Sequence, residues 1–61
     1  MPTITVEGPK TADLEKKRSL VKMLTAAAVE FYGFPAETIV VVIKENDPVN
    51  VGVGGILVAD R

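Results

Sequence analysis

Proline is the second residue of the chain, directly before a segment with the pattern of a β-strand. Removal of Met1 would leave Pro2 with a free secondary amine on a rigid ring, the only strong nitrogen base of that kind in the sequence. The alternative is that Pro2 has no catalytic role, since proline is a common second residue. The chain has no cysteine and no histidine, which excludes thiol nucleophiles, His-based triads and ordinary zinc sites. Pro2 is therefore the first candidate for a catalytic group.

The chain is short for a stable monomer. Its 61 residues make a single domain, 1–61, and a domain of this size buries only about 60% of its unfolded surface. Small domains usually gain stability from disulfides, a metal or oligomerisation, and here oligomerisation is what remains. Hydrophobic residues make up 48% of the chain, a surplus that usually lies in an interface. We expect an obligate homo-oligomer.

The charge pattern argues against nucleic acid as a partner, and the lengths of the apolar runs argue against a membrane. Seven basic and eight acidic residues give a formal net charge of −1. They are interleaved, as in Glu15-Lys16-Lys17-Arg18, so no basic face for nucleic acid is present. No apolar run approaches the roughly 20 residues of a membrane span, and no charged segment leads into a signal-like apolar one. We expect a cytoplasmic protein that binds neither nucleic acid nor membranes.

The first half of the chain predicts a strand followed by a long helix. Residues 2–7 alternate polar and apolar side chains, typical of a strand with two unlike faces, and Gly8-Pro9 should end it. Thr11 is a plausible N-cap for a helix over 12–32, and Gly33 should close that helix. Its apolar positions recur at intervals of three and four and should face the sheet: Leu20, Val21, Leu24, Ala27, Ala28 and Phe31.

The second half predicts a buried strand and a hairpin. Residues 34–37 read as a turn or a single helical turn begun by Pro35. Residues 38–43 then include five consecutive β-branched aliphatics, typical of a strand buried on both faces. One helix can cover only one face, so another subunit should cover the second. The glycine-rich segment 51–55 before 56–58 lacks the lysine of a phosphate loop and favours a short hairpin that packs on a neighbouring subunit.

The expected fold class is α+β. A strand, a crossover helix and a second strand in one sheet should give a β-α-β unit with parallel strands and a right-handed connection. The short C-terminal hairpin completes it.

The chain resembles the 4-oxalocrotonate tautomerase family through several features that occur together. These are Met1-Pro2 at the start of a strand, the long helix, the aliphatic strand ending in Glu45, and the Gly52-Val53-Gly54-Gly55 segment. The resemblance extends over essentially the whole chain. It implies a hexamer built as a trimer of dimers, each dimer with a four-stranded sheet under two helices.

The resemblance also implies a cofactor-independent tautomerase without a metal, acting on a small unsaturated keto or enol acid. Pro2 would be the general base that moves a proton between a carbon next to a carbonyl and another atom of the conjugated system. A proton carrier works best when its pKa lies near the operating pH. An apolar, positively charged pocket lowers the pKa of an amine and would also hold a substrate carboxylate.

Three positions depart from the family pattern. The family has one arginine after the first strand and another at the start of the second, and these positions are Ala12 and Val40 here. The aromatic residue expected before the glycine segment is Val51. Only Pro2 therefore carries over directly.

Other residues are candidates for the missing contacts. Lys10 is the best substitute cation for a substrate carboxylate, although a lysine binds it less specifically than a guanidinium, and an exposed turn lysine is the alternative reading. Arg18 and Arg61 are weaker candidates. Asn50 is a candidate donor of a hydrogen bond to the substrate. The alternative is that Asn50 only shapes a turn. The candidate site is thus Pro2 as catalytic base, with Lys10, Val40, Asn50 and Val51 as substrate-binding positions.

Two other functions remain open on the sequence. The substitutions at Ala12, Val40 and Val51 are consistent with an oligomer that keeps the fold and has lost its activity. The same proline could also serve a hydratase or a dehalogenase that acts on an unsaturated acid.

Overall fold

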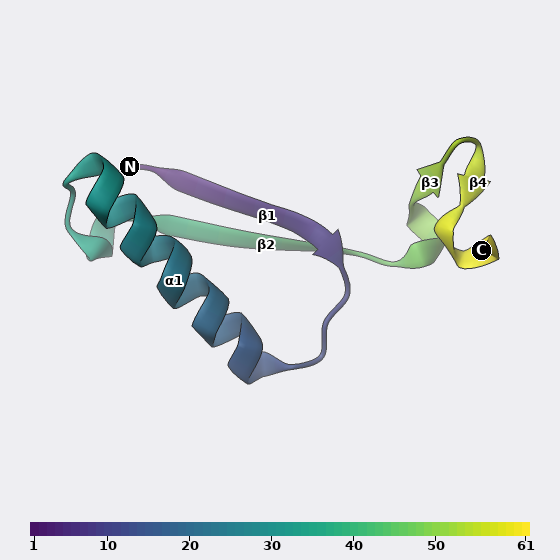
Figure 1. The fold of residues 1–61 in the computed structure, drawn as a ribbon, viewed down its shortest axis with the longest axis horizontal. Helices are drawn as coiled ribbons and strands as arrows, with labels where there is room; N and C mark the ends of the chain where they lie inside the picture. The colour runs from purple at the N-terminus through teal and green to yellow at the C-terminus, as the bar shows by residue number, and fades with distance from the viewer.

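A computed structural model describes residues 1–61. Strand β1 (Thr3–Pro9), helix α1 (Leu14–Tyr32) and strand β2 (Val40–Asn46) form the body, and strands β3 (Gly52–Val53) and β4 (Ile56–Leu57) form a hairpin (Figure 1). Three short 3-10 turns lie between or after them: η1 (Ala36–Thr38), η2 (Pro48–Asn50) and η3 (Val58–Asp60). β1 and β2 are parallel, whereas β3 and β4 are antiparallel. The predicted β-α-β unit with a C-terminal hairpin is confirmed.

The two long strands extend further than the sequence predicted. β1 does not end at Gly8, because Gly8 pairs with Glu45 and Pro9 pairs with Asn46. Pro9 is tolerated because it is the last residue of a strand that has only one neighbour in the chain. β2 begins at Val40, after the start of the predicted aliphatic run at residue 38, and ends at Asn46, one residue beyond Glu45. The turn after Pro35 is the single helical turn η1.

The ends of α1 show one wrong and one correct prediction. The N-cap is Asp13, whose Oδ1 accepts a hydrogen bond from the backbone N–H of Lys16 at 3.1 Å. Thr11 does not cap the helix, which begins at Leu14, and its own backbone N–H donates to Glu45. At the other end, Gly33 adopts a left-handed φ of 73° and its N–H donates to the Val29 carbonyl at 2.8 Å, as predicted for a C-terminal glycine.

Only a narrow stripe of α1 packs on the sheet. Ala28 on the helix and Ile39 before β2 are the only buried residues, with 6% and 9% of their surface exposed. Leu20 and Leu24 are half-buried on the same stripe. The sequence predicted that Val21, Ala27 and Phe31 would also face the sheet. That prediction is wrong for the single chain, because Val21 and Ala27 are exposed and Phe31 is 81% exposed. The helix carries more apolar surface than its own two strands can cover.

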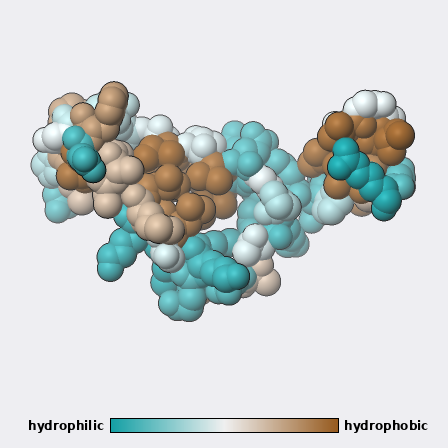
Figure 2. All heavy atoms as spheres, in the orientation of Figure 1, coloured by the Kyte–Doolittle hydropathy of each residue, from teal (hydrophilic) through white to brown (hydrophobic).

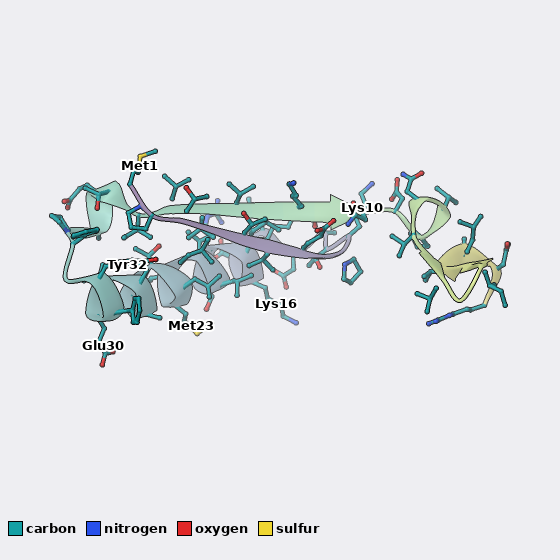
Figure 3. The ribbon with its side chains drawn as sticks, turned by 90° about the horizontal axis from the view of Figure 1, so that it is seen from above. Met1, Lys10, Lys16, Met23, Glu30 and Tyr32 are labelled. Carbon is teal, nitrogen blue, oxygen red and sulfur yellow. The ribbon has the colours of Figure 1, made fainter.

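The sheet likewise has one covered face. Residues alternate between the faces of a strand, so Ile4 and Val6 lie on the face with α1 together with their register partners Val41 and Ile43. The opposite face carries Thr5 and Val42, and nothing in the chain packs over it (Figure 3). Burial of this second face by another subunit stays a prediction.

The molecule is elongated. It measures 43 × 24 × 13 Å, with a radius of gyration of 14.8 Å, whereas a compact 61-residue domain would have about 10.5 Å. The hairpin stands apart from the sheet and helix (Figure 1). Hydrophobic residues gather in two places, over the helix and sheet and again over the hairpin (Figure 2). No helix is both long enough and apolar enough to cross a membrane.

Candidate active site

Pro2 lies at the start of β1, beside the start of β2. Its carbonyl accepts a hydrogen bond from the backbone N–H of Val40 at 2.9 Å, and Val40 is the register partner of Thr3. The structure therefore brings together two of the predicted site residues, Pro2 and Val40. Met1 is 89% exposed and projects from this end of the sheet (Figure 3), where an aminopeptidase can reach it.

A pocket of about 470 Å³ lies at the other end of the sheet, beside the C-terminal segment. We call it the sheet-end pocket. Its volume falls within the range of small-molecule sites. Val51, the position where the family pattern has an aromatic residue, contributes to its wall. The lining residues come from the ends of β1 and β2 and from the segment that follows: Glu7, Gly8, Pro9, Asn46, Pro48, Val51 and Val58.

Lys10 and Asn50 lie in the segments that border this pocket. Lys10 follows Pro9, and its Nζ lies 3.9 Å from Oδ1 of Asp47. Their side chains are 72% and 52% exposed, so the pair is held loosely. The backbone N–H of Asn50 donates to the Asp47 carbonyl at 2.8 Å, which closes η2. Asn50 therefore shapes a turn, whatever else its side chain does.

The two groups of predicted residues lie far apart in one chain. Pro2 and Lys10 are at opposite ends of β1, separated by eight steps of extended backbone, or about 26 Å. Figure 3 shows Met1 and Lys10 at opposite ends of the sheet. Pro2 therefore cannot share a small substrate with Lys10 or Val51 of its own chain. A site that uses both groups is complete only between chains.

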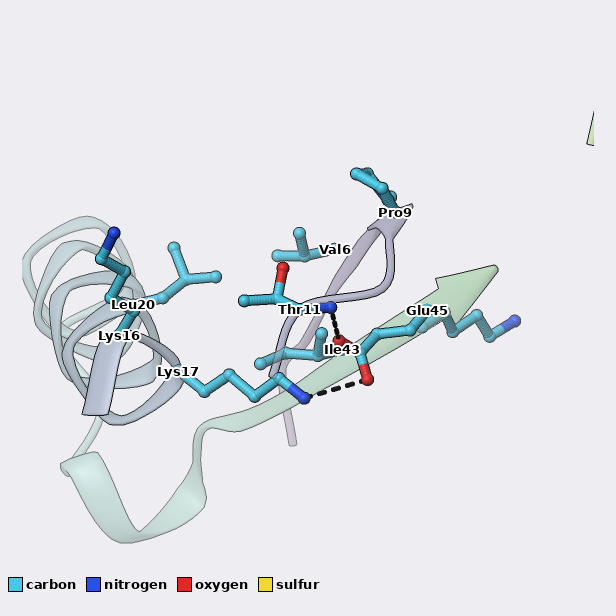
Figure 4. Close-up of a pocket in the computed structure, with 10 residues that line it drawn as sticks. Val6, Pro9, Thr11, Lys16, Lys17, Leu20, Ile43 and Glu45 are labelled. Atoms are coloured by element: carbon cyan, nitrogen blue, oxygen red, sulfur yellow. Dashed lines mark hydrogen bonds and ion pairs between the residues drawn. The ribbon is translucent and has the colours of Figure 1, made fainter. Parts of the chain in front are cut away.

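A second groove lies on the helix side of the sheet, with a volume of about 310 Å³ (Figure 4). Glu45 lies in its wall and joins three segments of the chain. Its Oε2 accepts a hydrogen bond from the backbone N–H of Thr11 at 2.6 Å, and its Oε1 accepts one from Nζ of Lys17 at 2.9 Å. The hydrogen bond from Lys17, followed by that from Thr11, lowers the pKa of the Glu45 carboxyl. This cluster fixes the start of α1 against the end of β2.

The remaining candidates have other partners or no charge. Arg18 forms an ion pair with Glu15 one helical turn away, and Ala12 precedes the helix without any charge to offer. Arg61 ends the chain, where its backbone N–H donates to the Val58 carbonyl. No group of three or more acidic side chains converges in a way that would hold a metal ion.

The parallel β-α-β unit, the glycine hairpin and the leading proline define the class of small tautomerase-fold proteins. Residues 2–61 match the family described as tautomerase enzyme, and the chain belongs to that family. The match begins at Pro2.

Individual relatives agree with this assignment. The chain is 38% identical to a probable tautomerase of Bacillus cereus, over 100% of both chains. Among solved structures it is similar to a 4-oxalocrotonate tautomerase homologue at 33% identity and a TM-score of 0.92, covering 100% of this chain and 97% of the other. A heterohexameric 4-oxalocrotonate tautomerase from Chloroflexus aurantiacus is 28% identical with a TM-score of 0.84, covering 98% and 97%.

Proposed function

We propose that this protein is a cofactor-independent tautomerase that converts an enol acid of the 2-hydroxydienoate type into its keto form. The nitrogen of Pro2, freed by removal of Met1, is the general base. The observation that carries this proposal is the family match, which begins at Pro2 and extends to the last residue of the chain. The chain has no histidine, the most frequent general base, and the prolyl amine is its one rigid secondary amine.

The proposed reaction needs one proton carrier. The lone pair of the Pro2 nitrogen takes the proton of the C2 hydroxyl, and the electrons of that O–H bond form the C2 carbonyl. The π electrons of the enol then take the proton back from the prolyl ammonium, at C3 or at the far end of the conjugated system. Pro2 ends the cycle unprotonated, so no other reactant is consumed.

We propose that the reacting site forms between chains in a homohexamer. One chain supplies Pro2 and Val40, and another supplies the sheet-end pocket with Val51, Asn50 and Lys10, because about 26 Å of strand separates the two groups in one chain. A hexamer occurs in the structurally similar tautomerase from Chloroflexus aurantiacus. In this arrangement Lys10 binds the substrate carboxylate once it leaves its loose pairing with Asp47.

An inactive oligomer of the same fold is the second candidate. Ala12 and Val40 carry no charge at the positions where the family has arginines, and Lys10 is 72% exposed. A site with these residues would bind a carboxylate weakly, and the fold would be unchanged. The two candidates therefore differ in activity and agree in assembly.

Ketonisation of 2-hydroxymuconate and of phenylenolpyruvate, followed by ultraviolet absorbance, tests the proposal. We expect Pro2→Ala to lower kcat/KM by at least about 100-fold, within the usual range for loss of a general acid–base group. Pro35→Ala is the matched control, because Pro35 precedes η1 outside the proposed site, and its rate should match the wild type. Intact mass should show that Met1 is absent from the active protein.

A variant whose N-terminus is extended, so that Pro2 stays in a peptide bond, should lose activity and keep its oligomeric state. Equal rates for wild type and Pro2→Ala would end the general-base proposal. No rate above buffer with an intact oligomer would favour the inactive homologue. Addition of water to the substrate, or release of halide from a halogenated one, would indicate a hydratase or a dehalogenase.

A further inference from the structure

The sheet-end pocket contains an acid that the proposed reaction does not use. Glu7 lines this pocket, and its Oε2 accepts a hydrogen bond from Nδ2 of Asn46 at 3.0 Å. Asn46 lines the same pocket from β2, as the register partner of Pro9. Glu7 is exposed in the single chain, and this hydrogen bond gives its carboxylate a defined position in the pocket wall.

Little positive charge opposes that carboxylate. Lys44 is the register partner of Glu7, but no ion pair joins the two side chains and Lys44 does not line the pocket. Lys10 follows the lining residue Pro9, and Asp47 shares its charge at 3.9 Å. Lys10 is therefore the proposed partner of one substrate carboxylate, and Glu7 places a negative charge in the pocket wall against a second one.

The rest of the wall is apolar where a substrate tail would lie. Pro48, Val51 and Val58 line the side formed by the C-terminal segment. A second carboxylate placed against these three side chains would lose hydration and gain no hydrogen bond from them. A methyl or aryl group placed there would bury apolar surface instead.

We propose that Glu7 is a specificity-determining residue that makes the sheet-end pocket select acids with one carboxylate over acids with two. This inference rests on the proposed function, since it assigns the substrate class of the same site. Repulsion between Glu7 and a second carboxylate about 6 Å away, near a protein surface and screened by salt at physiological ionic strength, corresponds to about a tenfold difference in binding.

A matched pair of substrates tests the inference. 2-Hydroxymuconate carries a carboxylate at each end, and 2-hydroxyhexa-2,4-dienoate has the same carbon chain with a methyl group at the far end. We expect the wild type to have a higher kcat/KM for the monoacid, and Glu7→Gln to lower the monoacid-to-diacid ratio by about tenfold. Glutamine keeps an oxygen that can accept the bond from Asn46. Glu30→Gln, on the exposed side of α1 (Figure 3), should leave the ratio unchanged.

Binding of unreactive acids gives a second readout that does not depend on turnover. Sorbate and trans,trans-muconate differ in the same way as the two substrates, and titration followed by NMR gives both dissociation constants. The wild type and Pro2→Ala should both prefer sorbate, and Glu7→Gln should lose that preference. Size-exclusion chromatography should show that Glu7→Gln keeps the oligomeric state of the wild type.

The outcomes separate the two proposals. An unchanged ratio in Glu7→Gln, with activity still abolished by Pro2→Ala, overturns the role of Glu7 and leaves the tautomerase proposal standing. A wild type that turns over neither enol acid overturns the tautomerase proposal, and the binding titration then decides the role of Glu7. Equal affinity for sorbate and muconate in the wild type, or the same preference in Glu7→Gln, contradicts the inference.

Discussion

At the scale of single residues, Glu45 is the side chain whose ionisation is tied most closely to the fold. Hydrogen bonds from Lys17 and Thr11 lower its pKa below the ordinary value. A carboxyl with a lowered pKa in the folded state stabilises the protein above its unfolded pKa of about 4.3. That stabilisation is lost as the pH falls below this value and through the lower pKa of the folded state.

The variant Glu45→Gln should therefore lose part of the acid dependence of stability. We expect the free energy of unfolding of the wild type, from urea titrations between about pH 7 and pH 3, to fall more steeply below about pH 4.3 than that of Glu45→Gln. At neutral pH the variant should be the less stable of the two. Glu30→Gln is the control, and its curve should run parallel to the wild type. A wild-type slope in Glu45→Gln would contradict the assigned role of this carboxylate.

Sequence reasoning at this scale singled out candidates by residue type and position, and it missed the residues that bond to a distant partner. Pro2 stands out by its position, and Val51 by its place in the family pattern before the glycine segment. The bonds from Asn46 to Glu7 and from Lys17 to Glu45 span 39 and 28 residues, and no local pattern indicates either of them. The separation of about 26 Å between Pro2 and Lys10 also could not be predicted from the sequence, since it depends on β1 continuing beyond Gly8.

At the scale of elements, Gly33 shows how one backbone conformation ends the long helix. Its φ is 73°, and an added Cβ would meet no atom within 4 Å. Within one chain, a substitution there adds backbone strain without a steric clash. We expect Gly33→Ala to lower the free energy of unfolding by about 1 kcal/mol per subunit, measured by urea titration. Gly33→Asn should lose less, because asparagine tolerates this conformation. Equal losses for both would point to a role other than φ.

The element types could be predicted, whereas their ends could not. Alternation in residues 2–7 and the aliphatic run near Val40 were enough to place two strands, and Gly33 was enough to end the helix. The predicted start of the helix was too early, because Asp13 and not Thr11 caps it, and the Thr11 backbone N–H donates to Glu45 of β2 instead. The end of β1 was misplaced because the partner strand continues beside Pro9. In both cases β2 makes a contact that no local pattern indicates.

At the scale of the whole molecule, the surface of one chain is larger than that of a compact protein of its size. One chain exposes 4824 Å², whereas a compact protein of 6.5 kDa exposes about 3,800 Å². Large apolar side chains account for part of the excess: Val42 on the open face of the sheet, Val21 and Phe31 on the helix, and Ile56 and Leu57 on the hairpin are all exposed. These surfaces belong to three separate elements, so we expect association between chains to cover them together.

The stability of this protein should therefore depend on its concentration. If folded chains exist only in the hexamer, a tenfold rise in total protein raises the apparent free energy of unfolding by about 1.1 kcal/mol per subunit, against about 0.7 kcal/mol for a dimer. Urea midpoints measured over about two decades of protein concentration distinguish these values, and sedimentation should give the matching mass. The slope should be the same for Pro2→Ala, because the assembly does not use the reactive nitrogen. A midpoint that stays constant over this range would mean that 61 residues with two buried side chains fold alone.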